Sequence, residues 1–277
     1  MDHNILYYLL YGFAAGLGEL LPVSAEVNGY LISLMTQFDT MHPALRLSIH
    51  FACFLAVFWG YSRRIGHIRR ELKIARMPQQ KRKRQPDLMA VLDAKVILAG
   101  LIPMVIGVAL SSAAYQRLAV LPWLSVLLVA GGILLYLPQY LPGANKDSRS
   151  LSRKDGLILG FSAALGVIPG FSRLGSMISV GLMKGCDRSY ILDMAMLASL
   201  PLLLGLMIVD GIALAMSATV ISGSMAICLL VASAAAFGGA WLGMVIMRFL
   251  SVKSNFYGFA YFNWGLALFG FLVYLMI

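Results

Sequence analysis

The stretch that decides the fold is Ala164–Ser176, which reads ALGVIPGFSRLGS. An apolar run stops there at Pro169 and Gly170, because proline removes a backbone donor and glycine lets the chain turn closely. A serine, an arginine and a second serine follow, and the apolar pattern then resumes to about Lys184. This pattern predicts two short helices joined by a polar break.

The polar break has the chemistry of an anion-binding site. The second short helix begins with backbone N–H groups that have no partner within the helix, beside a positively charged side chain. We expect phosphate to bind to Gly170, Ser172, Arg173, Gly175 and Ser176. Broken helices at membrane depth occur where protein encloses them or where they line a wet cavity, which favours a re-entrant loop. The alternative is a cytoplasmic hairpin between two ordinary membrane helices.

The composition is typical of a membrane protein. Of the 277 residues, 60% are hydrophobic and only 12% are charged, whereas soluble domains carry about 25% charged residues. Apolar runs long enough to cross a bilayer are predicted near 43–61, 96–113, 121–137, 190–208, 220–249 and 256–277. The expected fold class is therefore an all-α polytopic membrane protein.

A second broken segment lies near the N-terminus. Residues 5–18 are apolar but shorter than the roughly 20 residues of a full span. Residues 19–28 then read ELLPVSAEVN, and apolar sequence returns to about Met35. We expect a re-entrant hairpin over about 5–36, like the one over about 156–185. Fully crossing helices are the alternative at both places, because periodicity does not distinguish the two arrangements.

Each hairpin is followed by three predicted spans, so the same pattern occurs twice. Three is an odd number, so the second hairpin must enter the membrane from the side opposite to the first. This arrangement is an inverted-topology repeat. We expect one membrane domain, with a first repeat over 1–137, a linker over 138–155 and a second repeat over 156–277.

Basic residues indicate the orientation. The loop 62–86 carries ten Lys and Arg residues, which assigns it and the basic linker to the cytoplasm and to anionic lipid headgroups. Both termini are then extracytoplasmic, and the loops on that side hold isolated charges such as Asp39, Arg117 and Asp210. No nucleic-acid-binding motif accompanies the net charge of +10, so we expect no nucleic-acid partner.

Two acids, Glu19 and Glu26, lie in the first polar break. An ionised carboxylate in hydrocarbon is costly unless it is paired, protonated or hydrated, so both are functional candidates. The alternative is that they are solvated at the outer boundary of the membrane. With Ser24 and with Asn28, which is also expected to bind phosphate, they would face Arg173 where the hairpins meet. Carboxylates that hold a divalent cation and an arginine that grips phosphate together suit a diphosphate.

At these residues the chain resembles the undecaprenyl pyrophosphate phosphatase family, the bacitracin-resistance membrane proteins. The family's first motif, roughly E-F-L-P-[IV]-S-S-T-G-H, stands here as ELLPVSAEVN at 19–28. Its second, P-G-x-S-R-S-G-x-T-[IL], stands as PGFSRLGSMI at 169–178. The resemblance covers essentially the whole chain. It implies a bacterial inner-membrane enzyme that hydrolyses polyprenyl diphosphate to the monophosphate carrier of cell-wall synthesis, with Mg²⁺ or Ca²⁺ as cofactor.

The first motif departs from the family's pattern at three positions. Ala15 stands where the family has an additional glutamate, Ala25 where it has a second serine, and Asn28 where it has a histidine. An asparagine at the histidine position cannot act as a base near neutral pH. The missing histidine and serine favour a function in which no bond is broken.

The resemblance carries over two kinds of site residue. By direct match it implies Glu19 as a metal ligand, Arg173 as the phosphate clamp, and Ser24 and Ser172 as site serines. Glu26 is expected to supply the lost carboxylate, including as a metal ligand. His50, where the family tends to have glutamine, is expected to supply the lost imidazole. The alternative for an isolated membrane histidine is a packing role.

Two other functions stay open at the level of sequence. Opposed broken helices in an inverted repeat are also transporter architecture, so a flippase of polyprenyl phosphate lipids is the main alternative. A non-catalytic lipid sensor or resistance factor is the third. A homodimer is one arrangement that the sequence allows.

Overall fold

Both halves of the chain contain a pair of short helices and three long helices after it. The computed structural model describes residues 4–141, 145–147, 149–217, 220–253 and 256–276, and the regular elements in these ranges are all helices. Each half opens with a pair of short helices. These are α1 (Ile5–Glu19) with α2 (Ala25–Thr36), and α7 (Arg153–Leu165) with α8 (Arg173–Met183).

Three long helices follow each pair. They are α3 (Pro43–Gly60), α5 (Leu88–Leu118) and α6 (Leu121–Tyr136) in the first half, and α9 (Arg188–Met216), α10 (Gly223–Lys253) and α11 (Gly258–Met276) in the second. Within the described ranges, these six, with α6 continued to Tyr140, are long and apolar enough to cross a membrane. The predicted all-α polytopic membrane fold is therefore confirmed. Helix α4 (Ser62–Arg76), between α3 and α5, and two short 3₁₀ helices, η1 (Gln79–Lys81) and η2 (Leu137–Tyr140), complete the elements.

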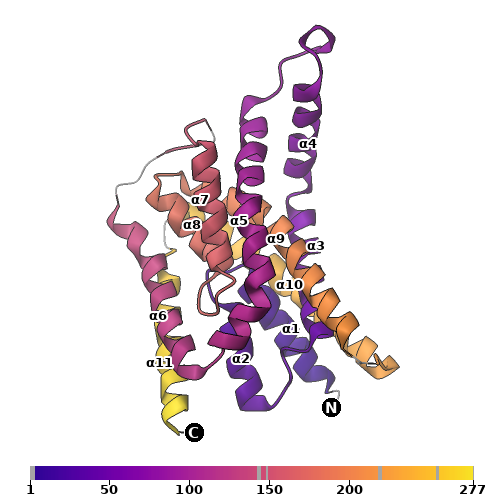
Figure 1. Cartoon of the computed structure of the whole chain (residues 1–277), viewed down its shortest axis with the longest axis vertical. Coiled ribbons are helices and arrows are strands. Elements are labelled where there is room, and N and C mark those ends of the chain that lie inside the picture. The colour runs from indigo at the N-terminus through magenta and orange to yellow at the C-terminus, as the bar shows by residue number, and fades with distance from the viewer. Residues whose placement is uncertain (1–3, 142–144, 148, 218–219, 254–255, 277) are drawn as a thin grey trace.

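The two helical hairpins approach one another from opposite ends of the molecule. In Figure 1, α1 rises from the lower end and α7 descends from the upper end, so the turns of both hairpins lie near the middle. The free ends of α1 and α11 both lie at the lower end, away from α4 at the top. The inverted repeat in a bilayer, with boundaries at 137 and 156, stays a prediction.

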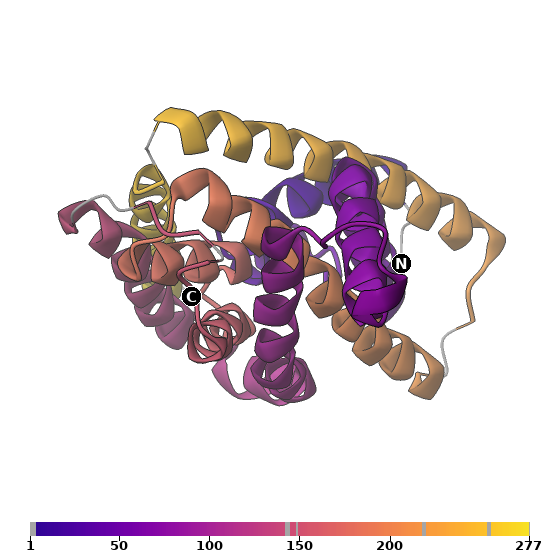
Figure 2. The ribbon, with the colours of Figure 1, turned by 90° about the horizontal axis from the view of Figure 1, so that it is seen from above.

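Close backbone packing holds α1 against α10. A methyl group added at Gly16 of α1 would lie 2.1 Å from the carbonyl oxygen of Ala236, and one at Gly239 of α10 would lie 2.2 Å from that of Phe13. Small residues let helix backbones approach closely in membranes, where packing drives association. Figure 2 shows α10 running along one edge of the molecule. The packing of α1 on α10 fixes the position of Glu19, the last residue of α1.

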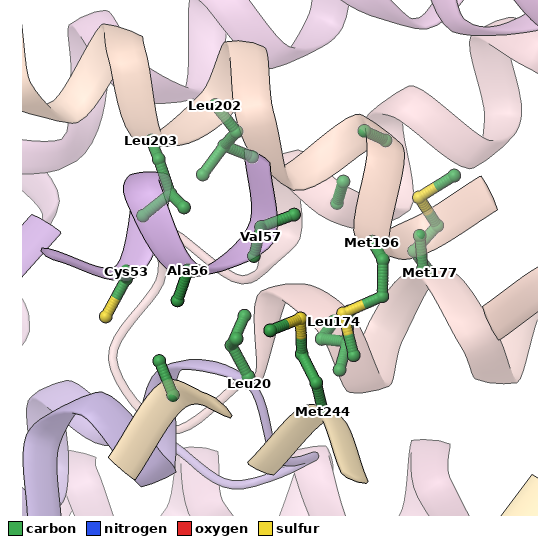
Figure 3. Close-up of a cluster of buried hydrophobic side chains, with 14 of the residues drawn as sticks. Leu20, Cys53, Ala56, Val57, Leu174, Met177, Met196, Leu202, Leu203 and Met244 are labelled. Atoms are coloured by element: carbon green, nitrogen blue, oxygen red, sulfur yellow. The ribbon is translucent and has the colours of Figure 1, made fainter. Parts of the chain in front are cut away.

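The core lies around the place where the hairpins meet. Figure 3 shows Leu20, which follows α1, and Leu174, at the start of α8, gathered with side chains of α3, α9 and α10. Met194 and Met196 of α9 are fully buried. In a bilayer such contacts stabilise through close packing. The core therefore positions both hairpin turns.

The basic segment 62–86 was expected to be a loop, and the structure corrects this. Residues 62–76 form helix α4 (Ser62–Arg76), and the segment after it is irregular apart from η1. Lys, Arg and Glu favour helix, and Ile65 and Ile68 pack on the hydrophobic core from one face of α4. Arg64 also pairs with Asp93 and Asp193 of the neighbouring helices. A basic segment therefore becomes an ordered projection at one end of the protein (Figure 1).

Two helices are longer than predicted, with consequences for the site. The span predicted at 190–208 continues to Met216, so the prediction that Asp210 lies in an outer loop is wrong: it lies inside α9 and is 4% exposed. The sequence after Asp210, GIALAM, is apolar enough to continue the helix. The span predicted at 96–113 is likewise α5, which begins at Leu88 with Asp87 as its N-cap.

The first polar break is also shorter than expected. The stretch 19–28 was predicted to interrupt the helix, but the turn contains only residues 20–24, and Glu26 and Asn28 lie on α2. The reason is Ser24, which caps α2 and so restarts the helix early.

Candidate active site

Two serines join the turns of the hairpins. Ser24 Oγ accepts a hydrogen bond from the backbone N–H of Gly170, with 3.0 Å between the two atoms. Ser172 Oγ donates to the carbonyl oxygen of Leu21 at 3.2 Å. Each serine is also the N-cap of the helix that follows it, because its Oγ accepts from the backbone N–H three residues on. The caps of α2 and α8 therefore lie where the two hairpins touch.

Gly170 is held in a conformation that L side chains rarely adopt. Its φ is +100°, and an added Cβ would lie 2.6 Å from the Cβ of Leu127 in α6. A Cβ added at Gly131 of α6 would lie 2.4 Å from the carbonyl oxygen of Gly170. The second turn is therefore pressed directly onto α6. The backbone N–H of Gly170, expected to bind phosphate, is donated to Ser24.

The first turn of α8 is partly capped from within. The backbone N–H of Gly175 donates to Ser172 Oγ at 3.1 Å, and that of Ser176 donates to the carbonyl oxygen of Ser172 at 2.8 Å. The expectation of free N–H groups at this helix start is therefore wrong for these two groups. The Ser176 side chain is buried. Ser172 and Arg173 of this segment do line the small cavity described below.

Glu19 and Arg173 form a buried ion pair between the two hairpins. A guanidinium nitrogen of Arg173 donates to Glu19 Oε2, and the side chains are only 12% and 7% exposed, respectively. The sequence predicted these residues on opposed hairpins, and the structure brings them into contact. Either charge alone would be costly at this depth, because burying an ion without its partner destabilises the protein by several kcal/mol. The pair therefore makes a site that an anionic ligand can enter by replacing the carboxylate.

A small cavity lies between the hairpin turns. It measures about 10 Å³ and is lined by Glu19, Ser24, Glu26, Ser172 and Arg173, among others. This volume is on the order of one water molecule. The Oε2 atom of Glu26 is buried, and within the described residues it has no hydrogen-bond partner. An unpaired buried carboxylate oxygen is unfavourable, so this atom is placed to hold a proton, a water or a cation.

His50 lies on the other side of Glu19. Its Nε2 faces Glu19 Oε1 at 3.7 Å, and its Nδ1 lies 2.6 Å from Asp210 Oδ2. Arg46 Nε lies 3.3 Å from the second oxygen of Asp210. A second cavity of about 30 Å³ is lined by Glu19, Glu26, Arg46 and His50. Histidine, arginine and three carboxylates therefore form one continuous polar cluster in an otherwise apolar bundle.

The sequence did not single out Arg46 or Asp210. One signal was present, because Arg46 lies four residues before His50 and therefore on the same face of α3. A second was the isolated acid at Asp210 within an apolar run, which is a functional candidate in any membrane span. From the sequence, Asp210 is instead predicted to lie in an outer loop.

The carboxylates present can be compared with what a divalent cation needs. In the described residues no group of three His, Cys, Asp or Glu side chains is arranged to hold a metal ion. Glu19 and Glu26 line the same small cavity, and Glu26 Oε2 has no partner there. Mg²⁺ is often bound through one or two carboxylates plus substrate phosphates and waters. The two glutamates therefore fit a cation that arrives with a diphosphate.

A much larger apolar cavity lies beside the first hairpin. It measures about 710 Å³, and its walls come from α1, α2, α10 and α11. Gly18, Val23 and Ala25 line both this cavity and the small one between the turns. Asn28, expected to bind phosphate, lines the large cavity. The small polar cavity and the large apolar cavity are thus neighbours across a single turn of chain.

Comparison with known proteins points to a single family. The model of the family described as bacitracin resistance protein BacA matches residues 8–269. A relative from Paracoccus denitrificans, named undecaprenyl-diphosphatase, is 30% identical over 216 residues, 76% of each chain. One of the same name from a Nocardioides species is 26% identical over 73% of each chain. Undecaprenyl-diphosphatase 2 of Halalkalibacterium halodurans is 23% identical over 97% of this chain and 95% of its own.

Proposed function

The chain belongs to the bacitracin resistance protein BacA family, and from this premise we propose that it is an undecaprenyl-diphosphate phosphatase. It is a multi-pass membrane hydrolase that releases the terminal phosphate and leaves the lipid monophosphate. The observation that carries this assignment to particular residues is the buried Glu19–Arg173 pair between the hairpin turns.

Arg173 binds the terminal phosphate in this proposal. A guanidinium matches phosphate as a two-pronged donor, and the anionic headgroup competes with Glu19 for it. The cavity of about 10 Å³ holds no diphosphate as it stands, so Arg173 must turn away from Glu19 when substrate enters. The released Glu19 carboxylate then faces the same space as Glu26. Binding of the substrate thus assembles the pair of carboxylates.

Glu19 and Glu26 would hold a divalent cation, Mg²⁺ or Ca²⁺. The cation would neutralise the diphosphate and stabilise the charge that develops on the leaving phosphate. Water is the attacking group, and Ser24 serves mainly to hold the two turns together, because its Oγ accepts from Gly170.

The prenyl chain occupies the large apolar cavity. This cavity adjoins the headgroup site at Gly18, Val23 and Ala25, so a lipid can place its diphosphate beside Arg173 and its tail among apolar side chains. We place the protein in the bacterial plasma membrane, with the α4 end in the cytoplasm and both termini outside, because ten basic residues lie at that end. A homodimer stays a prediction.

Phosphate release from purified protein tests this function. Undecaprenyl diphosphate and Mg²⁺ are supplied to wild type, to Arg173→Ala and to Arg69→Ala in lipid nanodiscs. Arg69 is an exposed arginine of α4 and serves as the matched control. We expect wild type and Arg69→Ala to release phosphate at equal rates. The rate of Arg173→Ala should be lower by at least about 100-fold, as is usual when a preorganised charge partner is lost.

Equal turnover by Arg173→Ala would overturn the assignment of the site. Movement of a labelled lipid phosphate across liposomes, with no phosphate released by wild type, would instead support the flippase.

A further inference from the structure

His50 and Asp210 form a contact that the phosphate-binding residues do not require. They come from α3 and α9 and are 160 residues apart in sequence, yet Nδ1 and Oδ2 are 2.6 Å apart. Both side chains are almost fully buried, at 7% and 6% exposed. A buried charge is costly unless paired, so a cluster of this kind in a membrane bundle marks a function in proton or ion handling more often than in packing.

The contact decides which nitrogen of His50 carries the hydrogen. An ionised carboxylate only accepts hydrogen bonds, so the short bond to Asp210 requires a hydrogen on Nδ1. In the neutral ring, Nε2 is then an acceptor. At 3.7 Å from Glu19 Oε1 it is too far for a direct hydrogen bond, and His50 lines the cavity of about 30 Å³. That space has room for water beside Nε2.

Arg46 completes the support of this ring. Its Nε lies 3.3 Å from the Asp210 oxygen that His50 does not use. With one oxygen facing Arg46 and the other facing His50, the carboxylate is held on both sides. Carboxylates that orient an imidazole in this way fix its tautomer and stabilise the imidazolium that forms during proton transfer.

We propose that His50 is the general base of the hydrolysis and that Asp210, supported by Arg46, is its positioning residue. This inference rests on the proposed function and deepens it. Water attacks the terminal phosphorus: the new P–O bond forms as the bond to the bridging oxygen breaks. The bridging electron pair leaves with the lipid monophosphate. The water proton passes to His50 Nε2, and from there to the departing inorganic phosphate.

Other groups near His50 are less suited to this role. Glu19 is paired with Arg173 in the absence of substrate, and it would help to hold the cation when substrate is bound. Glu26 is the remaining carboxylate of the cavity, but no side chain of the described residues orients its Oε2. Asp210 has no role in binding phosphate in the proposed site. We therefore expect its effect on catalysis to pass through His50, whose Nδ1 it contacts, while Arg46 holds its other oxygen.

A double-mutant cycle tests the proposal. Phosphate release is measured for wild type, His50→Gln, Asp210→Asn and the double variant, with Asp39→Asn, an exposed aspartate, as control. We expect His50→Gln to lower kcat by at least about 100-fold, as is usual for loss of a general base. We expect Asp210→Asn to lower kcat by about tenfold or more, with KM within about threefold of wild type. The double variant should match His50→Gln, because Asp210 acts only through His50.

The outcomes separate this proposal from the function on which it rests. Full turnover by His50→Gln overturns the base while leaving the phosphatase intact. Additive losses in the double variant, with a lowered melting temperature of Asp210→Asn, overturn the positioning role in favour of a structural one. If Asp210→Asn does not fold, phosphate release by His50→Gln alone decides whether His50 is the base, because glutamine keeps a hydrogen-bonding side chain at position 50. If wild type releases no more phosphate than Arg173→Ala does, both the phosphatase function and the role of His50 as its base are overturned.

Discussion

Ser24, in the turn of the first hairpin, accepts a hydrogen bond from the backbone N–H of Gly170 in the turn of the second, with 146 residues between them in sequence. The same oxygen caps α2. One side chain thus starts a helix and joins two hairpins. The position of Glu26 on the first turn of α2 depends on this cap.

We expect Ser24→Ala to lower the stability of the protein by about 1–3 kcal/mol, since it removes a helix cap and leaves a buried N–H without its partner. Turnover should fall but persist, because water is the attacking group. Thermal unfolding and phosphate release in detergent measure both effects. Ser162→Ala is the matched control, because this buried serine donates to the carbonyl oxygen of Leu159 in its own helix. A loss of about 10⁶-fold would instead identify Ser24 as the nucleophile.

The packing of α1 on α10 gives a second prediction with a control at the adjacent residue. Gly239→Ala places a methyl group 2.2 Å from the carbonyl oxygen of Phe13, whereas a methyl group at Gly238 meets nothing within 4 Å. We expect Gly239→Ala to destabilise by about 1–3 kcal/mol, as overpacking does. Gly238→Ala should be neutral or slightly stabilising, because alanine favours helix. Equal melting temperatures of the two variants would contradict the close packing of these helices.

The adjoining cavities predict that Ala25 controls access of the lipid tail. Ala25→Phe adds bulk where the large cavity and the headgroup cavity meet. We expect kcat/KM for undecaprenyl diphosphate to fall about tenfold, equivalent to about 1.4 kcal/mol of overpacking. A short-chain prenyl diphosphate should be hydrolysed at close to the wild-type rate. Ala113→Phe, on an exposed part of α5, is the control. An equal loss for both substrates would place the tail elsewhere.

The basic projection gives a prediction about pH. Hydrogen bonds from Arg84 and from the backbone N–H of Asp87 hold the pKa of Glu71 below its ordinary value of 4.5. A lowered pKa means that the interaction stabilises the folded segment fully above pH 4.5. The stabilisation is lost as the pH falls through the lower, folded-state pKa. The segment after α4 should therefore stay docked from pH 7 to pH 4.5 and loosen below it.

Fluorescence anisotropy of a label at Lys83→Cys measures this docking. Glu71→Gln carrying the same label should be loose at every pH, because glutamine does not ionise. An unchanged anisotropy in Glu71→Gln at pH 7 would show that the ion pair does not order the segment.

Local rules made much of the fold and part of the site predictable. Pro169 and Gly170 mark the second hairpin turn, the cost of charge in hydrocarbon indicates Glu19, and a positive charge beside a helix start indicates Arg173. The same rules misplaced the end of α9, because an isolated Asp210 resembles the boundary of a span. They also treated 62–76 as a loop, because a basic segment outside the membrane carries no strong apolar pattern.

The amino-acid sequence by itself determined an all-helical membrane chain with two broken hairpins, because helix interruption and the solubility of apolar runs in lipid depend on neighbouring residues. Only the tertiary structure decided that Ser24 joins Gly170, and that His50 meets Asp210 of a helix 160 residues further along. Such contacts depend on how closely whole helices pack, which is set by glycines and small side chains spread over the chain. No local pattern contains that information.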